Sequence, residues 1–296
     1  MAACYGGWLT GVAGLAHLSG DPLTWWAIPV AAYATALFAS LQHETIHGHP
    51  TRSARINEWL VFIPLGLFIP YRRFKHLHLR HHNDTHLTDP YDDPESWYVA
   101  PADWAALPAP ARALLTANMT LLGRLTLGPL LSIVGFVRSE VRLTLHGSRA
   151  DRARIFDAWG RHAAGLILLL ALLGAMGVSP LTYLFAAALP GFSLLMLRTF
   201  AEHRAAAEVP ERTAIVEAHP VLALLYLNNN LHAVHHAYPR APWYALPGLY
   251  SALGHGLRRG NGGLYYGGYG SVLRRFAVRP VDSAEHPIAR SINSSK

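Results

Sequence analysis

The placement of basic residues constrains the fold of this chain more than any other feature of its sequence. Residues 1–51 and 162–197 contain no lysine or arginine, and all 25 basic residues lie elsewhere. Each of these two stretches holds a pair of apolar runs with a short polar turn between them, Ser-Gly-Asp-Pro in the first and Gly-Val-Ser-Pro in the second. The apolar runs are residues 5–18, 23–41, 163–176 and 181–197. A helix of about 20 apolar residues spans a bilayer, so we expect two membrane hairpins, with the first run marginal in length.

The charges also predict the orientation. Neither hairpin turn contains a lysine or arginine, so every basic segment is expected on one side, which the positive-inside rule makes the cytoplasm. Only 15% of the residues are charged, against roughly 25% in a soluble domain, which again favours a bilayer. We therefore predict an all-α polytopic membrane protein, with four spanning helices in two hairpins, interfacial helices and a cytoplasmic histidine-rich cap. It is expected to be one domain over residues 1–296, with an irregular tail from about residue 260.

Three further segments complete this prediction. Asn57–Pro70 and residues 114–137 are apolar but interrupted. We expect Asn57–Pro70 to be re-entrant or interfacial, and residues 114–137 to form a helix that lies in the membrane interface. Val221–Tyr238 is expected to form one helix that ends before Pro239.

Three groups of histidines lie in the segments expected on the cytoplasmic side. The groups are H-x-x-x-H at His43 and His47, H-x-x-H-H at His78, His81 and His82, and H-x-x-H-H at His232, His235 and His236. Residues three and four apart share one face of a helix, so each group can converge on a metal. Imidazole suits zinc, copper, iron and nickel alike. Eight ligands exceed what one catalytic ion uses, so two ions with open positions are the natural count.

Other interpretations account for fewer of these residues. His43-Glu44-Thr-Ile-His47 matches the zinc metalloprotease pattern H-E-x-x-H, with Glu44 as general base. That interpretation leaves the other six histidines without a role. A metal transporter needs ligands inside its spans, and only His17 and His162 come near them. The arginines are spread between apolar runs rather than gathered in a stripe, which argues against a nucleic-acid partner.

Cys4 is the only cysteine, which excludes a disulfide framework, a cysteine-ligated zinc site and an iron–sulfur cluster within the chain. Any electrons that the chemistry needs must come from another protein. Polar residues near the boxes are expected to orient the ligands. The candidates are Asn228, four residues before His232 on the predicted helix, and the acids Asp84, Asp89 and Glu202, with Glu44 and Asp92 as further acids.

The segments H-E-T-I-H, H-L-R-H-H and H-A-V-H-H resemble the three histidine boxes of the membrane fatty acid desaturase family. The resemblance covers residues 37 to about 247, including the acidic turn after the second box. It implies a non-haem diiron centre, dioxygen as co-substrate, and a lipid or acyl substrate that is desaturated or, in related branches, hydroxylated. It also implies an external electron donor of the ferredoxin or cytochrome type. The expected location is the bacterial inner membrane.

The resemblance further suggests a ninth ligand. Family members with an extra histidine ligand carry it just past the fourth span, where this chain has His203, 29 residues before His232. Some relatives have an asparagine at the position of Thr199. The alternative is that His203 only lies among the interface charges of Glu202 and Arg204.

Overall fold

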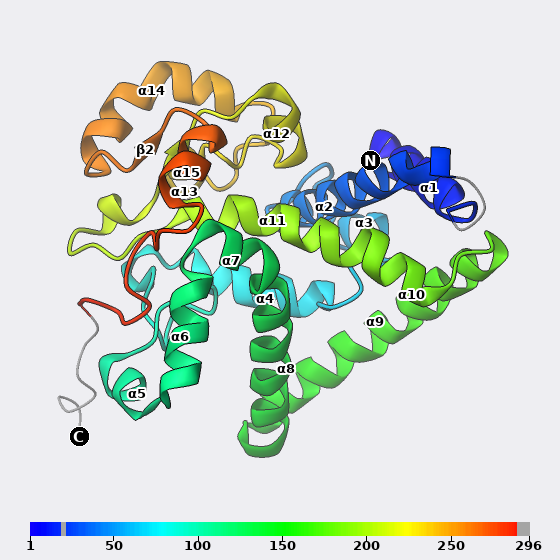
Figure 1. The fold of residues 1–296 in the computed structure, drawn as a ribbon, viewed down its shortest axis with the longest axis horizontal. Helices are drawn as coiled ribbons and strands as arrows, with labels where there is room; N and C mark the ends of the chain where they lie inside the picture. The colour runs from blue at the N-terminus through cyan, green and yellow to red at the C-terminus, as the bar shows by residue number, and fades with distance from the viewer. Residues whose placement is uncertain (19–21, 289–296) are drawn as a thin grey trace. The chain divides into compact units, whose positions relative to one another are not determined.

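The computed structural model describes residues 1–18 and 22–288 and is mostly helical (Figure 1). The chain forms two compact units. Unit 1 comprises Met1–His76, Pro129–Leu195 and Leu225–Leu227, and unit 2 comprises Leu77–Gly128, Met196–Leu224 and Asn228–Lys296. The expectation of a single domain over residues 1–296 stays a prediction.

The elements are as follows. Unit 1 contains α1 (Ala2–Leu15), η1 (Pro22–Trp26), α2 (Ala27–Ile46), α3 (Ala54–Leu60), α9 (Arg149–Ala175), α10 (Pro180–Tyr183) and the π-helical turn η3 (Leu184–Ala188). Unit 2 contains η2 (Asp84–His86), α5 (Pro101–Ala106), α6 (Ala109–Asn118), α7 (Leu121–Thr126), η4 (Val209–Arg212), β1 (Ile215–Val216), α13 (His232–Ala237), α14 (Leu246–Gly260), β2 (Tyr265–Tyr266) and α15 (Tyr269–Phe276). Four helices contribute residues to both units: α4 (Tyr71–His81), α8 (Gly128–His146), α11 (Leu189–Glu202) and α12 (Pro220–Leu225).

Helices α1 and α2 of unit 1 pack through small residues. A Cβ at Gly11 would lie 2.7 Å from the backbone nitrogen of Ala31, and one at Gly14 would lie 2.6 Å from the Cβ of Ala27. Small residues let two helix backbones approach closely, as is common between helices in a bilayer. The predicted turn between these helices falls on residues 19–21, which lie outside the described part of the chain.

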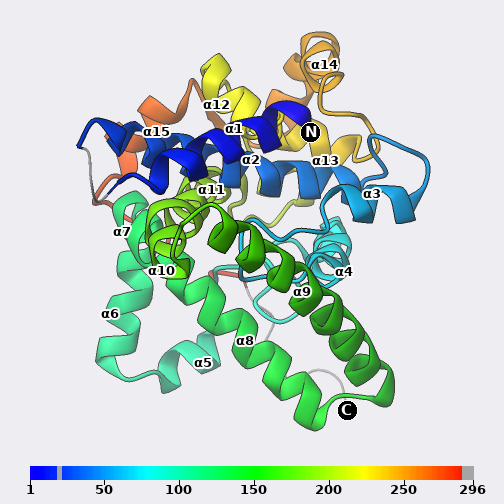
Figure 2. The same ribbon diagram turned by 90° about the vertical axis from the view of Figure 1, so that its right-hand side faces the viewer.

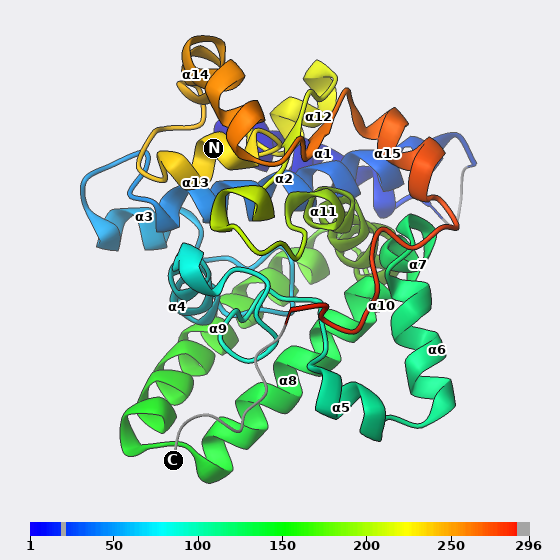
Figure 3. The same cartoon turned by 90° about the vertical axis from the view of Figure 1, so that its left-hand side faces the viewer.

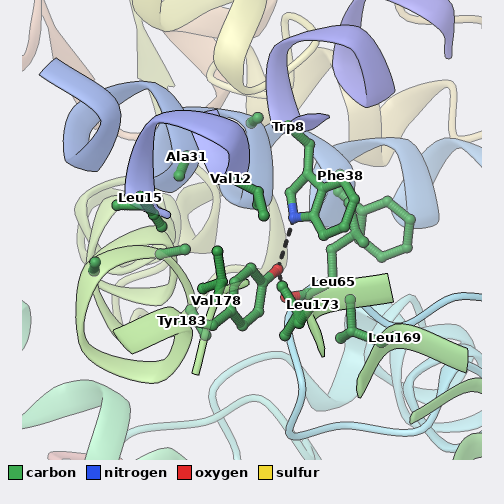
Figure 4. Close-up of a cluster of buried hydrophobic side chains, with 14 of the residues drawn as sticks. Trp8, Val12, Leu15, Ala31, Phe38, Leu65, Leu169, Leu173, Val178 and Tyr183 are labelled. Carbon is green, nitrogen blue, oxygen red and sulfur yellow. Dashed lines mark hydrogen bonds between the residues drawn. The ribbon is translucent and has the colours of Figure 1, made fainter. Parts of the chain in front are cut away.

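The core of unit 1 is built around Tyr183 (Figure 4). Its hydroxyl accepts a hydrogen bond from Trp8 Nε1 at 2.8 Å and donates one to the carbonyl oxygen of Leu65 at 2.7 Å. The buried side chains of Phe38 and Leu169 pack in the same cluster. Because both polar atoms have partners, the phenol and indole rings can be buried without an unsatisfied group.

Three helical segments are long and apolar enough to cross a membrane: Leu23–Ile46, Arg149–Ala175 and Pro180–Glu202. Helix α1 has 14 residues, fewer than the roughly 20 that a span requires. The structure therefore identifies three candidate spans among the described residues, and the fourth stays a prediction. Helix α9 also exposes large apolar side chains, with Ile167 68% exposed and Leu168 48% exposed. Such side chains suit contact with lipid.

The helices on this part of the chain differ in extent from the apolar segments of the sequence. The apolar run that begins at residue 163 is the second half of α9, which begins at Arg149 and follows α8 after a short turn (Figure 2). The cause is a capping box: Ser148 Oγ accepts from the backbone nitrogen of Asp151, and Asp151 Oδ2 accepts from that of Ser148, both at 3.1 Å. Residues 114–137 are likewise not one interfacial helix, because they are divided among α6, α7 and α8.

The predicted helix Val221–Tyr238 is also wrong, since α12 ends at Leu225 and α13 begins at His232. Between them Leu227 (φ 48°) and Asn228 (φ 59°) adopt the left-handed conformation, which interrupts a right-handed helix. Asparagine tolerates this conformation better than most residues. The run Asn228-Asn229-Asn230 was the turn signal that the apolar periodicity concealed.

In the tail that is predicted to be irregular, the described residues include the short strand β2 and the helix α15 of unit 2, and the residues around these two elements are irregular (Figure 3). Tyr265–Tyr266 pairs in parallel with Ile215–Val216, and α15 follows at Tyr269. Further on, the nitrogen of Val99 donates to the carbonyl oxygen of Ala284, and the nitrogen of His286 donates to that of Val99, both at 2.9 Å. The C-terminal segment is thus hydrogen-bonded to Val99, which lies just after the acidic turn of the second histidine box.

Candidate metal centre

The second histidine box lies at the end of α4 and continues into an acidic turn. His78 and His81 are each 2% exposed. His81 Nδ1 donates to Asp93 Oδ1, and His78 Nδ1 donates to Glu95 Oε1, both at 2.9 Å. Each carboxylate therefore fixes the tautomer of one histidine and makes Nε2 the nitrogen that can bind a metal.

The turn that supplies these carboxylates is itself held by hydrogen bonds. Thr88 adopts φ 70°, which is uncommon for a β-branched residue. Its nitrogen donates to Asp93 Oδ2 at 2.9 Å, and its carbonyl oxygen accepts from Ser96 Oγ at 2.8 Å. Backbone conformations of this kind cluster at functional sites, where the surroundings hold them in place.

His203 follows directly after α11. The residue forms an antiparallel bridge with Thr213, and its Nδ1 donates to the carbonyl oxygen of Arg212 at 3.1 Å. This contact leaves Nε2 of His203 as an acceptor, as in His78 and His81.

The third box forms the short helix α13, whose three histidines are all buried. His232 Nδ1 donates to Asn229 Oδ1 at 3.0 Å, and Glu202 Oε1 lies 3.3 Å from the same nitrogen. The asparagine turn therefore does more than end α12, because it presents Asn229 to a histidine one helical turn further on.

Four histidines of unit 2 converge on one point: His81, His203, His232 and His236. One ring nitrogen of each lies within 4.8 Å of the corresponding atoms of the other three. His203 Nε2 is 3.1 Å from His81 Nε2 and 3.0 Å from His232 Nε2. The Nδ1 atoms of these three residues all donate to oxygen. In neutral rings the Nε2 atoms therefore carry no proton, and their lone pairs point toward one another.

Protonation of the imidazole rings does not remove the repulsion between all of these lone pairs. Burial lowers the pKa of His203, His232 and His236 well below the ordinary value, and neighbouring histidines lower it further. In His81 burial also acts downward, but the carboxylates of Glu95 and Asp93 outweigh it and raise its pKa to about 9. A proton on His81 can bridge its contact with His203, yet the contact between His203 and His232 still joins two lone pairs. A metal cation satisfies all of them at once.

The spacing of the nitrogen atoms fits a metal of high coordination number. With metal–nitrogen bonds of about 2.1 Å, two ligands at a right angle are about 3.0 Å apart, and two at the tetrahedral angle about 3.4 Å apart. The observed separations of 3.0 and 3.1 Å match the right angle. Ligands at right angles leave further positions open around an ion, unlike the closed tetrahedral set of structural zinc.

A second group of unit 2 contains His78, His82 and His235. His82 Nε2 lies 3.0 Å from His78 Nε2 and 3.1 Å from His235 Nε2. Glu95 is close to both groups, since its Oε2 atom is also 4.0 Å from His81 Nε2. Burial acts to raise the pKa of Glu95, but the charges of His81 and His78 and the hydrogen bond from His78 outweigh it and hold the pKa well below the ordinary value.

The first box lies in unit 1, at the end of α2. His43 is buried, and its ring centroid is 4.7 Å from that of His47. The i, i+4 spacing thus brings the two imidazoles together on one helix face, as the sequence predicted. Their membership of the metal centre is a proposal.

The polar residues predicted to orient the ligands lie as follows. Glu202 lies beside His232 and also contacts Arg198 at 2.7 Å. Asn228 is not on the helix of the third box, as predicted, and its Nδ2 donates to the carbonyl oxygen of Trp243 at 3.0 Å. Asp89 Oδ1 accepts from the backbone nitrogens of Tyr91 and Asp92, so it stabilises the turn. The side chain of Asp84 lies outside the described part of the chain.

Sequence reasoning missed three partners that the structure reveals: Asp93, Glu95 and Asn229. Asp93 and Glu95 belong to the acidic turn noted after the second box. A turn has no simple periodicity, so the sequence alone could not show which of its acids face the histidines.

Together, the helices long enough to span a membrane and the buried histidine clusters define an integral membrane protein with a metal-binding centre. The family model described as fatty acid desaturase matches residues 3–268, and the chain belongs to that family. The family implies an oxidoreductase that acts on a lipid or acyl substrate. No curated protein matches the chain.

Proposed function

We propose that the chain is an O₂-dependent diiron oxidoreductase that desaturates the acyl chain of a lipid or fatty acid. The observation that carries this proposal is the buried group of His81, His203, His232 and His236, whose lone pairs face one another in a desaturase-family chain. The family match favours this function over a zinc protease built on His43, Glu44 and His47.

Nine histidines are proposed as the ligands. One iron would be held by His81, His203, His232 and His236, and the other by His78, His82 and His235 together with His43 and His47 of unit 1. When bound, iron supplies the redox chemistry that activates dioxygen against an unactivated C–H bond, which side-chain acids and bases cannot break.

The chain's own residues prepare the imidazoles for this role. Asp93, Glu95, the Arg212 carbonyl oxygen and Asn229 accept the Nδ1 protons of four ligands, so Nε2 of each of these rings is the unprotonated nitrogen that can bind metal. The four ligands are His81, His78, His203 and His232. Burial excludes water and keeps most of the rings neutral, which is the form that binds metal. The nine proposed ligands include no carboxylate, and the charge of the acidic turn partly balances that of the ions.

The overall reaction determines which partner is needed. Desaturation removes two hydrogen atoms from adjacent carbons, with their two electrons, and reduces O₂ to two molecules of water. That reduction takes four electrons and four protons, so two electrons and two protons come from outside the substrate. With one cysteine and no ligand set for an iron–sulfur cluster, the chain takes these electrons from a separate ferredoxin or cytochrome.

The proposed location is the bacterial inner membrane, with four spans and the histidine boxes on the cytoplasmic side. The support is the absence of Lys and Arg from residues 1–51 and 162–197.

Lipid mass spectrometry of cells that express the protein, grown with and without air, tests the function. We expect air-dependent loss of two hydrogen atoms from an acyl chain, and no such loss in cells that express His81→Ala. Gain of one oxygen atom instead would identify a hydroxylase on the same scaffold.

A further inference from the structure

Unit 1 contains a cavity of about 120 Å³ that the metal centre does not use. Six residues line it: Arg55, Glu58, Trp59, Phe62, Arg72 and Arg161. Arg55, Glu58 and Trp59 belong to α3, and Phe62 follows that helix. Arg72 lies at the start of α4 and Arg161 in the middle of α9. These three helices lie on the same side of unit 1 (Figure 2). The space is sufficient for several water molecules or one phosphate group.

The charges around the cavity leave one cation in excess. Arg72 pairs with Glu58 at 2.7 Å and with Asp157 at 2.6 Å, and Arg161 pairs with Asp157 at 3.2 Å. These four groups neutralise one another. Arg55 is exposed and, among residues 1–18 and 22–288, makes no ion pair with a carboxylate. A fixed site with one unmatched guanidinium suits a ligand that carries one negative charge.

The cavity lies at the level where the helices of unit 1 change from polar to apolar. In α9 the last cation is Arg161, and the exposed side chains of Ile167 and Leu168 follow within two turns. On α3, Trp59 is 68% exposed and Ile56 is 51% exposed beside Arg55. Tryptophan and arginine together are typical of the headgroup layer of a membrane, where lipid phosphates lie.

A smaller cavity adjoins the first one and reaches the helix of the first histidine box at Gln42. It shares Glu58, Phe62, Arg72 and Arg161 with the larger one and is also lined by Gln42 and Tyr71. Gln42 immediately precedes His43 on α2. A lipid whose headgroup occupied the larger cavity would therefore lie beside the helix that carries that box.

We propose that the larger cavity binds the phosphodiester of the phospholipid that carries the acyl substrate, with Arg55 as its unpaired cation. This inference rests on the proposed function, because it assigns the carrier of the same substrate. A phosphodiester carries one negative charge, equal to the surplus of the site. An acyl thioester of a nucleotide carrier brings several charges and fits the surplus less well.

The test compares Arg55→Gln with the matched control Arg52→Gln, an arginine that is also exposed but does not line the cavity. Retention of phosphatidylglycerol by the iron-loaded protein in detergent is measured by native mass spectrometry. The KM and kcat for the same lipid are measured with a chemical reductant. We expect Arg55→Gln to weaken retention and raise KM about tenfold, since hydrogen bonds to charged groups contribute on this scale, and to leave kcat unchanged. Arg55→Lys should recover part of the loss.

Three outcomes would overturn the proposal. The two glutamine variants could bind and turn over the phospholipid equally well. The retained phospholipid could pass through turnover with its acyl chain unmodified, which would make it a structural lipid. The KM effect could be confined to an acyl thioester. The retention measurement needs no turnover, so an enzyme that binds the lipid through Arg55 but modifies no acyl chain would refute the proposed function and leave the phosphate site standing.

Discussion

Replacing Asp93 by asparagine tests whether its carboxylate supports the metal centre through His81. Asp93 Oδ1 accepts from His81 Nδ1, and Oδ2 accepts from the nitrogen of Thr88, in a side chain that is almost fully buried. Asparagine keeps the shape but turns one acceptor into a donor, which then faces one of these N–H groups. Loss of such a partner lowers metal affinity by about 10–100-fold. That range corresponds to about 1.4–2.7 kcal/mol.

Chelator competition measures this loss. Iron per chain is followed at increasing chelator concentration for the wild type, Asp93→Asn and the control Asp92→Asn, whose side chain is exposed in the same turn. We expect Asp93→Asn to lose iron at a chelator concentration at least tenfold lower, while the control follows the wild type. Equal iron retention in a folded Asp93→Asn protein would show that the hydrogen bond to His81 does not support metal binding.

Three further predictions address the ligands, the titration of the site and the topology. His203→Ala should lower iron content and abolish turnover as fully as His235→Ala, whereas His219→Ala, an exposed histidine outside the boxes, should retain both; an iron-replete, active His203→Ala protein would limit the ligands to the eight box histidines. The metal-free protein should lose thermal stability as pH falls below about 6.5. Below that pH, His203, His232 and His236 bind protons in the unfolded chain but stay neutral in the folded one, because their pKa values are lowered there. The raised pKa of His81 acts in the opposite sense, with a smaller loss of stability as pH rises toward 9, and thermal unfolding that does not depend on pH would contradict both effects. A cysteine at Ser179 should react with a membrane-impermeant reagent from outside the cell and one at Ser148 only from inside, against a background of the single buried Cys4; labelling of both from the same side would contradict the hairpin model.

The histidine boxes were predictable because their geometry is local. In α2 and α4 the distance between ligands depends only on the helical repeat, so His43 and His47, or His78 and His81, share a face whatever surrounds them. The family resemblance was equally accessible, since it rests on the same residues, and the family match confirms it.

The helix boundaries were less predictable, although local signals for them exist. Apolar periodicity alone placed the start of α9 at the edge of the bilayer and missed the capping box of Ser148 and Asp151 in the preceding polar stretch. It also carried a helix through Asn228, where the backbone adopts φ 59°. In both places the helix boundary depends on short polar residues whose side chains form hydrogen bonds with the backbone. A hydrophobicity pattern does not show these hydrogen bonds.

Apart from Glu202, which lies beside His232, the partners of the ligands were beyond sequence reasoning, and the reason lies in how the centre is built. Each Nδ1 proton is held by an oxygen from a different kind of segment: a carboxylate in a turn, the carbonyl of Arg212, and the amide of Asn229. The carbonyl has no sequence signature at all, since every residue carries one. Only the fold chooses which of them meets a histidine. Substitutions near Arg212 can therefore change metal binding through backbone geometry alone. We expect the loss of metal affinity to depend on how far a substitution disturbs the bridge between His203 and Thr213, and not on the chemistry of the side chain that is replaced.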